Sequence, residues 1–514
     1  ESTERLSGTA PQSPDLTTPE QHIPKVFDHD STPKAHSELN AFVPYLNSLH
    51  SRNAETDNAL AESQALNSFF PLIQVSHPIV ELIESVLLGS TKTHVILTGH
   101  AGDGKSTIAI ELLKRLRGVP ALKPLGEALK QREELVAKSF SISLIKDFSE
   151  WSPSDRQQLL DEMLVPQGNR FLLISNTGTM LDTFRAHEHS GDWVGIESEL
   201  LASMGQPQGG NIQFHQSAFL VLNMAMIDNL GIARKIFDRM LHPDRWLACS
   251  SCGDRRQCPI VTNVSLIQAN QAVVTDRLFL AYRRMFEYGS RLTLRQLSAH
   301  MAYMITSGLS HDDASAIAKR ANPPLMSEFM FFNRFFGDNG VEIDEPSLQI
   351  RAIRAAREEG FGDQPSPTWE RRLWLNSRGQ AFTLRAAATP EDCELLLQIG
   401  AGKRIVDSIT GAQAREQVRR IVFFLHSFET ADDGRFLSSY LKSEMLLAFA
   451  RWQAQFNDVL SLQEATLLKR QVIHVLQEHF TLNSAFDRHQ RPLFGVRLEG
   501  KPTKVLEYPT QHEA

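Results

Sequence analysis

The chain has 514 residues, of which 42% are hydrophobic and 22% charged, a balance typical of folded globular proteins and not of disordered or fibrous ones. This length exceeds one ordinary core and predicts about three domains. The net charge of -7 argues against a protein that coats nucleic acid over its whole surface, and leaves room only for a local basic patch. No apolar run approaches the roughly 18 residues of a membrane helix. We therefore expect a cytoplasmic protein with no membrane partner.

The first part of the chain predicts a polar arm followed by helices. Residues 1–36 are rich in Pro, Ser and Thr, so burial cannot offset the entropy of ordering them, and we expect a flexible arm. Apolar residues at helical spacing between residues 37 and 88 predict one or two helices before the first core strand.

Apolar runs then alternate with helical patterns, which predicts an α/β fold with a parallel sheet covered on both faces. The expected strands are His94–Thr98, Phe140–Ile145, Phe171–Ser175 and Ala218–Leu222, and the expected helices are Ile108–Leu116, a segment near Leu125–Val136, and Asn223–Met240. Together with the N-terminal helices and a cysteine-rich segment at 242–260, this gives a first domain over 37–262. Paired amphipathic helices predict a helical lid over 263–321, and a mostly α-helical C-terminal domain follows over 322–514.

A glycine-rich motif directly follows the strand His94–Thr98. The residues Gly99-His100-Ala101-Gly102-Asp103-Gly104-Lys105-Ser106 fit the pattern Gly-x-x-x-x-Gly-Lys-Ser, and Thr107 starts the next helix. Glycines let backbone N–H groups approach phosphates, the lysine reaches the outer two phosphates, and the serine hydroxyl binds Mg²⁺. The sequence therefore predicts a P-loop NTPase that hydrolyses ATP. The expected cofactor-binding residues are Gly99, Gly102, Asp103, Gly104, Lys105, Ser106 and Thr107.

The metal and the attacking water also need a carboxylate at the tip of a neighbouring strand. The strand Phe140–Ile145 is followed by Lys146 and Asp147, so Asp147 is the expected second Mg²⁺ ligand, and Glu150 is the candidate base for water. Asp147 to Glu150 also fit a capping box, so helix capping is an alternative or an additional role. No Asp-Glu pair ends this strand, which leaves the identity of the catalytic base open.

Two further polar residues are candidates for sensing the nucleotide. Asn176 follows the strand Phe171–Ser175, where AAA+ ATPases place sensor 1, and it is predicted to orient water; an ordinary turn asparagine is the alternative. Arg295 begins a lid helix and is predicted to act as sensor 2, with a solvated helix arginine as the alternative. For an arginine that completes a neighbouring subunit's site in a homo-oligomer, no residue stands out among Arg185, Arg234 and Arg239.

Three of the four cysteines lie within one short polar stretch. Cys249 and Cys252 are separated by two residues, and Cys258 follows. The close pair has the spacing of a tetrahedral zinc knuckle, so we expect a structural Zn²⁺ site with His242 as the nearest fourth ligand. His215 and Cys393 are other candidates for that position. An iron–sulfur cluster and unliganded buried thiols are the alternatives.

The order of these motifs resembles the F component of DNA phosphorothioation-dependent restriction systems. The resemblance rests on Gly102 to Ser106, on Lys146 to Ser149, on the Cys-x-x-Cys with Cys258-Pro259-Ile260 and Asn263, on Leu294-Arg295, and on Phe335-Phe336-Gly337. It covers roughly residues 90–375. It implies an AAA+-like ATPase in a bacterial anti-phage complex, acting on DNA directly or through partner proteins of the same defence cassette. It also implies that Lys105, Ser106 and Asp147 handle ATP and Mg²⁺, and that Cys249, Cys252 and Cys258 form a zinc-like knuckle. The sequence offers no cluster of paired acids with a lysine at strand spacing, so we expect any cleavage of DNA to belong to a partner.

Two functions follow as hypotheses. The first is an ATP-driven motor or switch that remodels DNA or a partner complex. The second is a sensor or scaffold that binds ATP, hydrolyses it slowly and oligomerises. A small-molecule kinase is disfavoured because nothing after the lid indicates an acceptor pocket.

Overall fold

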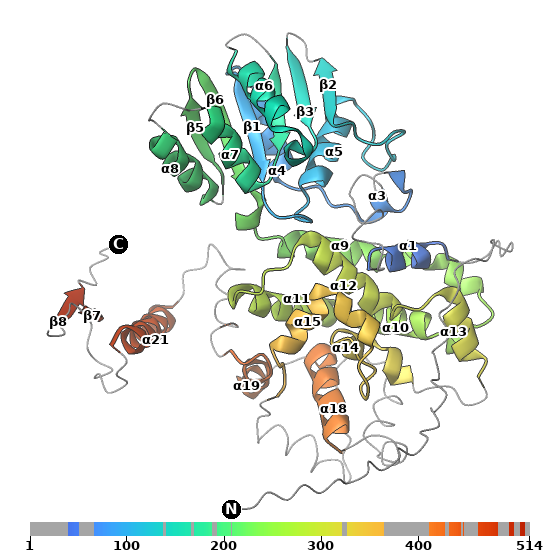
Figure 1. The fold of residues 1–514 in the computed structure, drawn as a ribbon. Coiled ribbons are helices and arrows are strands. Elements are labelled where there is room, and N and C mark those ends of the chain that lie inside the picture. The colour runs from blue at the N-terminus through green and yellow to red at the C-terminus, as the bar shows by residue number, and fades with distance from the viewer. Residues whose placement is uncertain are drawn as a thin grey trace, which may run out of the picture.

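The computed structural model describes residues 40–50, 66–136, 140–165, 169–187, 193–206, 208–320, 326–363, 411–426, 431–443, 446, 461–481, 493–497 and 504–508. Most of this chain forms two layers, a sheet layer and a helical layer, which lie one above the other (Figure 1). The predicted N-terminal arm lies outside the described residues. No helix in the described ranges combines the length and the apolarity needed to cross a membrane.

The sheet layer is an α/β unit with six strands in the order β2-β3-β4-β1-β6-β5. The strands are β1 (Thr93–Thr98), β2 (Arg132–Val136), β3 (Ser141–Ile145), β4 (Arg170–Ile174), β5 (Gly210–Phe214) and β6 (Ser217–Asn223). The central strand β1 pairs in parallel with β4, through Val95 and Leu172, and with β6, through Val95 and Leu220. β2 and β5 run antiparallel at the two edges. The four predicted strands, β1, β3, β4 and β6, form the expected parallel core, and the two edge strands, which were not predicted, make the sheet mixed.

The edge strands were the elements that the sequence did not reveal. A helix was predicted near Leu125–Val136, but Arg132–Val136 is strand β2, where buried Glu133 and Leu135 alternate with more exposed neighbours. Pro124 and Gly126 break any helix before this point. β5 begins at a glycine, Gly210, which pairs with Val221 of β6, and it was not among the predicted strands.

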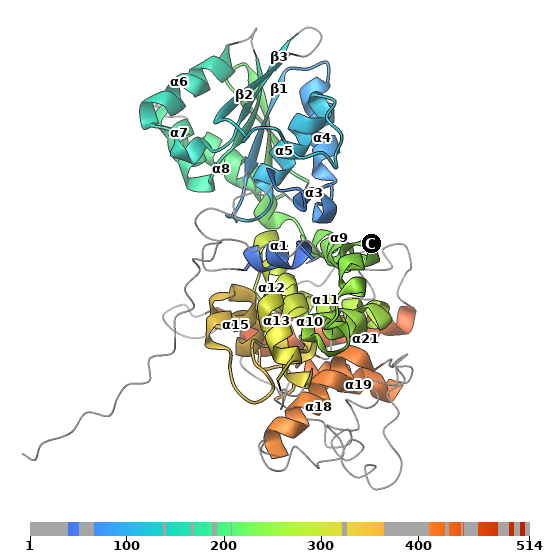
Figure 2. The same ribbon diagram turned by 90° about the vertical axis from the view of Figure 1, so that its right-hand side faces the viewer.

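Helices cover both faces of the sheet (Figure 2). One face packs on α4 (Ile79–Leu88) and α5 (Lys105–Leu116), and the other on α6 (Pro153–Leu164), α7 (Thr177–His187) and α8 (Trp193–Met204). Successive side chains of β1 point to opposite faces of the sheet, since Val95 and Leu97 belong to the first core and Ile96 to the second. All three are fully buried. This two-sided burial explains why β1 reads as a continuous apolar run.

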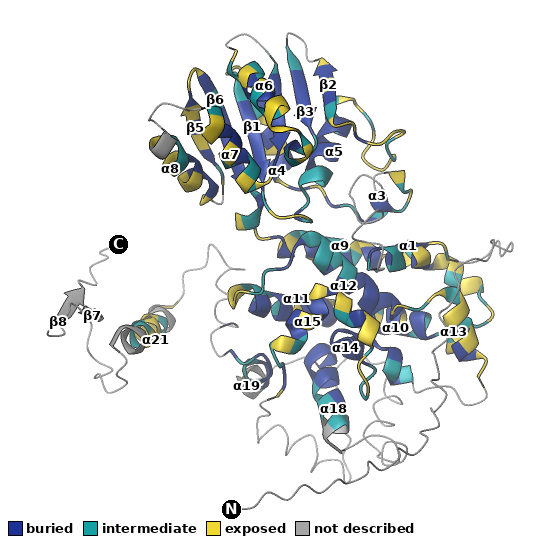
Figure 3. Ribbon diagram, viewed as in Figure 1, coloured by how far each residue is buried: buried dark blue, intermediate teal, exposed yellow. Residues whose placement is uncertain are grey.

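The helical layer has one hydrophobic core, in which the inner faces of the helices are buried (Figure 3). Its helices are α1 (Phe42–Ser48), α3 (Phe70–Ile73), α9 (Leu230–Met240), α10 (Pro259–Ala269), α11 (Gln271–Glu287), α12 (Leu294–Thr306), α13 (His311–Ala318), α14 (Phe331–Arg334) and α15 (Arg351–Glu358). α12 starts with a capping box between Thr293 and Gln296 and ends at Ser307, whose φ is 57°. Helical α1 and α3, which precede the sheet in sequence, thus share a core with helices that follow it.

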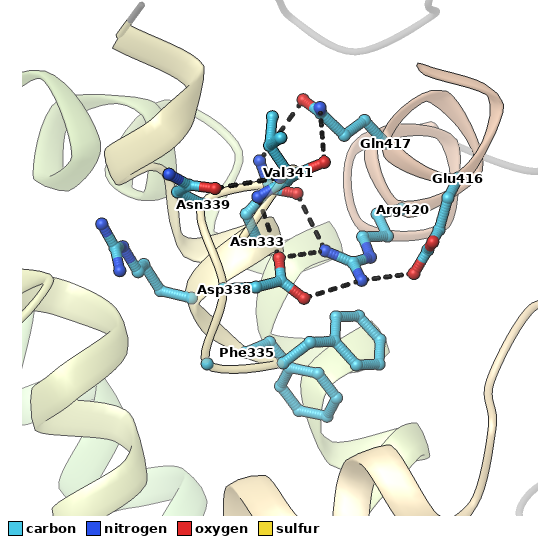
Figure 4. A network of polar contacts seen from close by, with 12 residues as sticks. Asn333, Phe335, Asp338, Asn339, Val341, Glu416, Gln417 and Arg420 are labelled. Carbon is cyan, nitrogen blue, oxygen red and sulfur yellow. Dashed lines mark hydrogen bonds and ion pairs between the residues drawn. The ribbon is translucent and has the colours of Figure 1, made fainter. Parts of the chain in front are cut away.

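The C-terminal part adds α18 (Gly411–Leu425), α19 (Ala431–Tyr440), α21 (Leu462–Thr481) and a hairpin of β7 (Leu493–Arg497) and β8 (Lys504–Tyr508). α18 joins the helical layer through a buried polar network (Figure 4). Arg420 donates to both carboxylate oxygens of Asp338, at 2.6 and 3.0 Å, and to the side-chain oxygen of Asn333 at 3.1 Å. Its guanidinium also lies 4.2 Å from the ring centre of Phe336. The described part of the range 322–514 contains these helices, and the hairpin is an addition that the sequence did not reveal.

Candidate functional site

The glycine-rich loop lies at the carboxyl end of the central strand β1. Gly99, Gly102 and Gly104 all have positive φ, at 138°, 86° and 96°, and Gly104 is the N-cap of α5. A Cβ atom at Gly102 would lie 2.9 Å from Oγ1 of Thr293 and 3.0 Å from Cβ of Arg295. Glycine is therefore required both by the backbone conformation and by the close approach of α12. The loop turns the chain sharply, so that α5 begins directly beyond the carboxyl end of β1.

Lys105 is the first residue of α5, and its side chain folds back over the loop. Its Nζ donates to the carbonyl oxygens of Gly99 and His100, at 2.8 and 2.9 Å. Burial lowers the pKa of the Lys105 ammonium group, the carboxylates of Asp103 and Asp147 oppose this change, and the guanidinium of Arg295 adds to it. Two acidic groups and one basic group thus act on the lysine: Asp103 from its own loop, and Asp147 and Arg295 from distant parts of the sequence.

A cavity of about 330 Å³ opens beside this loop. The predicted site residues that line it are Gly102, Gly104, Lys105, Ser106, Thr107, Asp147, Glu150, Asn176 and Arg295. They come from the loop, from the ends of β3 and β4, and from α12. In open α/β sheets, ligands bind outside the carboxyl ends of the strands, at the point where the strand order changes direction. β1 lies at this point, because the chain first places β3 and β4 on one side of β1 and later places β6 on its other side.

Asp147 follows β3 and fulfils the capping role that was one of its two predicted roles. Its Oδ1 accepts a hydrogen bond from the backbone N–H of Ser149 at 2.9 Å, which caps the short 3₁₀ helix Phe148–Glu150. The same side chain lines the cavity. One carboxylate oxygen is therefore held by the backbone while the group faces the space beside Lys105. Glu150, which is exposed, also lines this space.

Asn176 follows β4 and is joined to the end of β3. Its backbone N–H donates to Oγ of Ser149 at 3.2 Å. Asn176 is exposed and its side chain lines the cavity. The ends of these two parallel strands are thus fixed next to each other, with a carboxylate on one and an amide on the other.

Arg295 lies on the first turn of α12, which docks against the glycine-rich loop. Its backbone N–H donates to the carbonyl oxygen of Gly102 at 3.2 Å. The structure therefore brings this predicted residue to the loop from nearly two hundred residues away in sequence. Ser298, one turn further along α12, also lines the cavity.

Two of the predicted cofactor-binding residues, Gly99 and Asp103, belong to the loop but are not among the residues that line the cavity. Asp103 is fully buried, and its Oδ2 accepts from the backbone N–H of His100 at 2.9 Å. Its Oδ1 accepts from Arg291 at 2.9 Å. Sequence reasoning missed Arg291, although it lies only four residues before Arg295 and carries a charge opposite to that of the loop aspartate.

Part of the cavity lining is apolar and was not predicted at all. The apolar lining residues include Leu49, Phe70, Ile73 and Val75, which precede the sheet, and Ile232 and Ile236 of α9. His77 is the histidine in this lining. In the sequence these residues form ordinary helical stripes, so no local signal marks them as parts of a site.

The cysteine segment is separate from this cavity. Cys249, Cys252 and Cys258 are half-buried, carry no disulfide, and line one small cavity of about 40 Å³. Burial raises the pKa of the Cys249 and Cys258 thiols. Within the described ranges, no group of three or more His, Cys, Asp or Glu side chains is arranged to hold a metal ion.

The predicted fourth ligand, His242, is not among the residues that line the cysteine cavity. It is exposed, its Nδ1 lies 3.5 Å from Asp244, and it caps a 3₁₀ helix. The imidazole that lines the cysteine cavity is that of His311, at the start of α13. Asn40 donates to Sγ of Cys249 at 3.3 Å.

Comparisons with protein-family models, with curated proteins and with solved structures give no match to this chain.

Proposed function

We propose that this chain binds ATP with Mg²⁺ in the cavity beside the glycine-rich loop and hydrolyses it, as a P-loop ATPase of the AAA+ type. The observation that carries the proposal is the convergence of Lys105, Asp147 and Asn176 at the carboxyl ends of three adjacent parallel strands. In this assignment the loop amides and Lys105 hold the phosphates, and Ser106 and Asp147 hold Mg²⁺. Lys105 exchanges two backbone carbonyl partners for the phosphate oxygens when the nucleotide binds.

The remaining residues have roles in the chemical step. Glu150 and Asn176 lie at neighbouring strand ends, where Glu150 accepts a proton from the attacking water and Asn176 orients it. The guanidinium of Arg295, close enough to lower the pKa of Lys105, stabilises negative charge on the outer phosphate. Because Arg295 belongs to α12, loss of that phosphate weakens the attachment of the helical layer to the loop. This link supports an ATP-driven switch over a passive ATP-binding scaffold.

The direct test is the ATPase activity of purified protein and of Lys105→Ala. Loss of the ammonium group should lower the rate by about 100-fold or more, the cost of removing one stabilising donor from an enzyme site. Lys123→Ala, outside the cavity lining, is the matched control and should keep wild-type activity. Hydrolysis that survives in Lys105→Ala would reject the assignment.

A second experiment separates the switch from the scaffold. Mass measurement with and without ATP should reveal a change of assembly state for a switch, and none for a plain scaffold. The contact between α12 and Gly102 supports the first outcome, since a change of the loop on nucleotide binding would pass to the helical layer through it.

The wider proposal is that the ATPase works in a bacterial anti-phage restriction complex, together with partner proteins and DNA. The motifs that resemble the F component of phosphorothioation-dependent restriction systems support it. ATP hydrolysis should then rise when DNA or the neighbouring cassette proteins are added. If neither DNA nor the cassette proteins change the rate of an otherwise fully active enzyme, the ATPase assignment stands and this wider role is rejected.

A further inference from the structure

Three adjacent parallel strands, β3, β4 and β1, end beside the cavity, and each is followed by a part of the proposed ATP site. Asp147 follows β3, Asn176 follows β4, and the glycine-rich loop begins at Gly99, directly after β1. The pairing of β3 with β4 ends at Ile145, and that of β4 with β1 ends at Ile174. The three site groups therefore lie beyond the paired part of the sheet, and their relative positions depend on other contacts.

Ser149 makes the first of these contacts, between the ends of β3 and β4. Its Oγ accepts a hydrogen bond from the backbone N–H of Asn176 at 3.2 Å. Its own backbone N–H donates to Oδ1 of Asp147 at 2.9 Å. The neighbouring side chain of Phe148 is fully buried and anchors this 3₁₀ helix. One residue thus joins the expected Mg²⁺ ligand to the residue that carries the amide.

A pair of threonine hydroxyls makes the second contact, between the ends of β4 and β1. Oγ1 of Thr177 and Oγ1 of Thr98 lie 2.9 Å apart, so one hydroxyl donates to the other. Thr177 directly follows Asn176, and Thr98 directly precedes Gly99. Thr98 is fully buried, where a hydroxyl without a partner is costly. The hydroxyls of Ser149, Thr177 and Thr98 thus form a hydroxyl row across the three strand ends.

The partners of this hydroxyl row are unusual for serine and threonine near turns. Such hydroxyls commonly bond to the backbone of their own segment. Here Ser149 bonds to a residue 27 positions away, and Thr98 to one 79 positions away. The row therefore links separate segments and does not cap a local turn. Ser149, Thr98 and Thr177 are not among the residues that line the cavity, so they act through their neighbours.

We propose that Ser149, Thr177 and Thr98 are positioning residues, whose hydroxyl row holds the metal-binding carboxylate, the water-orienting amide and the phosphate loop in register. The inference rests on the proposed function. Attack of water on a phosphate needs closely aligned groups, and small displacements slow the reaction more than they weaken binding. Loss of the row should therefore lower kcat and leave the affinity for ATP nearly unchanged.

The test is the steady-state ATPase kinetics of the full-length chain and of Thr98→Val and Ser149→Ala. Each variant removes one hydroxyl with little change in volume, so kcat should fall by about tenfold and KM for ATP should change by less than about twofold. Thr98→Ser and Ser149→Thr keep a hydroxyl and should recover most of the rate. The matched control is Thr183→Val, which removes a buried hydroxyl that bonds to the carbonyl oxygen of Thr179 within α7 at 2.7 Å. It should keep wild-type kinetics.

A double variant separates positioning from a general loss of stability. If Ser149 acts through Asn176, Ser149→Ala should lower kcat by less than about threefold in an Asn176→Ala background, whereas independent effects would multiply. Multiplying effects, a change confined to KM, or wild-type kcat in both hydroxyl variants would overturn the positioning role and leave the ATP site intact. If Thr98→Val does not fold, Ser149→Ala decides, because Ser149 is only half-buried. A wild-type chain without ATPase activity would instead reject the proposed function.

Discussion

Arg291 donates to the carboxylate of Asp103 at 2.9 Å, and this ion pair connects the helical layer to the back of the glycine-rich loop. The Asp103 side chain is fully buried, and Arg291 also donates to the carbonyl oxygen of Met224 at 2.8 Å. The arginine thus bridges the loop after β1 and the segment after β6. Since α12 begins three residues later, the loop and the first turn of this helix are fixed together from two sides.

Removal of this arginine should therefore be costly. Arg291→Ala removes the ion-pair partner of a buried carboxylate, and we expect the free energy of unfolding to fall by up to about 3–5 kcal/mol. Affinity for ATP should fall as well, because the loop loses its support. Denaturant unfolding and ATP titration measure the two effects. The double variant Asp103→Asn/Arg291→Ala should recover part of the stability, since a neutral amide needs no countercharge.

The control for this pair is Arg234→Ala. Arg234 forms a salt bridge with Asp276 in which both side chains are exposed, so the loss should be at most about 1 kcal/mol. If Arg291→Ala destabilises the protein no more than Arg234→Ala, the pair has no special role in holding the loop.

The sequence predicted the parts of the site that depend on local signals. A continuous apolar run identified β1, and the glycine spacing identified the loop, because both patterns are set by neighbouring residues. Leu49 precedes the sheet strands in the sequence and Ile236 follows them, so their meeting at one cavity depends on how these two segments pack together. Arg291 gains its role only through contact with a loop far away in the chain. Such relationships follow from tertiary packing, which no residue spacing records.

Acid should destabilise this protein in a defined window. Burial lowers the pKa of four histidines, His50, His77, His94 and His300, from 6.5 to about 4. The unfolded chain takes up protons as pH falls through 6.5, whereas the folded chain resists until about pH 4. Stability is thus complete above about pH 6.5 and is lost towards pH 4, by up to about 3 kcal/mol for each fully buried imidazole. Unfolding measured at intervals between pH 7 and pH 4.5 should reveal this decline.

One of these histidines offers a clean variant for the pH effect. His94→Phe removes an imidazole from the buried centre of the sheet, so the decline between pH 6.5 and pH 4.5 should become shallower, whatever its effect at pH 7. His242→Ala, which removes an exposed imidazole, should leave the curve parallel to wild type. Parallel curves for all three proteins would show that the buried imidazole does not contribute.

Zinc at the cysteine segment remains a prediction, and metal analysis of the purified protein tests it. If Cys249, Cys252 and Cys258 bind zinc, the protein should contain about one ion per chain, and Cys252→Ser should remove it. The placement of His311 at the same cavity predicts that His311→Ala lowers the zinc content. His242→Ala is the matched control, and it should not change the zinc content because that imidazole points to Asp244. Protein purified without chelators that holds no zinc would reject the site.

The attachment of α18 should depend on the buried pair of Arg420 and Asp338. Arg420→Ala removes the buried partner of the Asp338 carboxylate and leaves it with the partly exposed Arg357 and the backbone N–H of Gly340, so the free energy of unfolding should fall by up to about 3–5 kcal/mol. Arg357 contacts the same carboxylate at 3.1 Å but is 32% exposed, so Arg357→Ala is the matched control and should cost at most about 1 kcal/mol. The double variant Arg420→Met/Asp338→Leu should regain stability, because two apolar side chains need no countercharge. Equal effects of the two single arginine variants would mean that α18 is held by apolar packing alone.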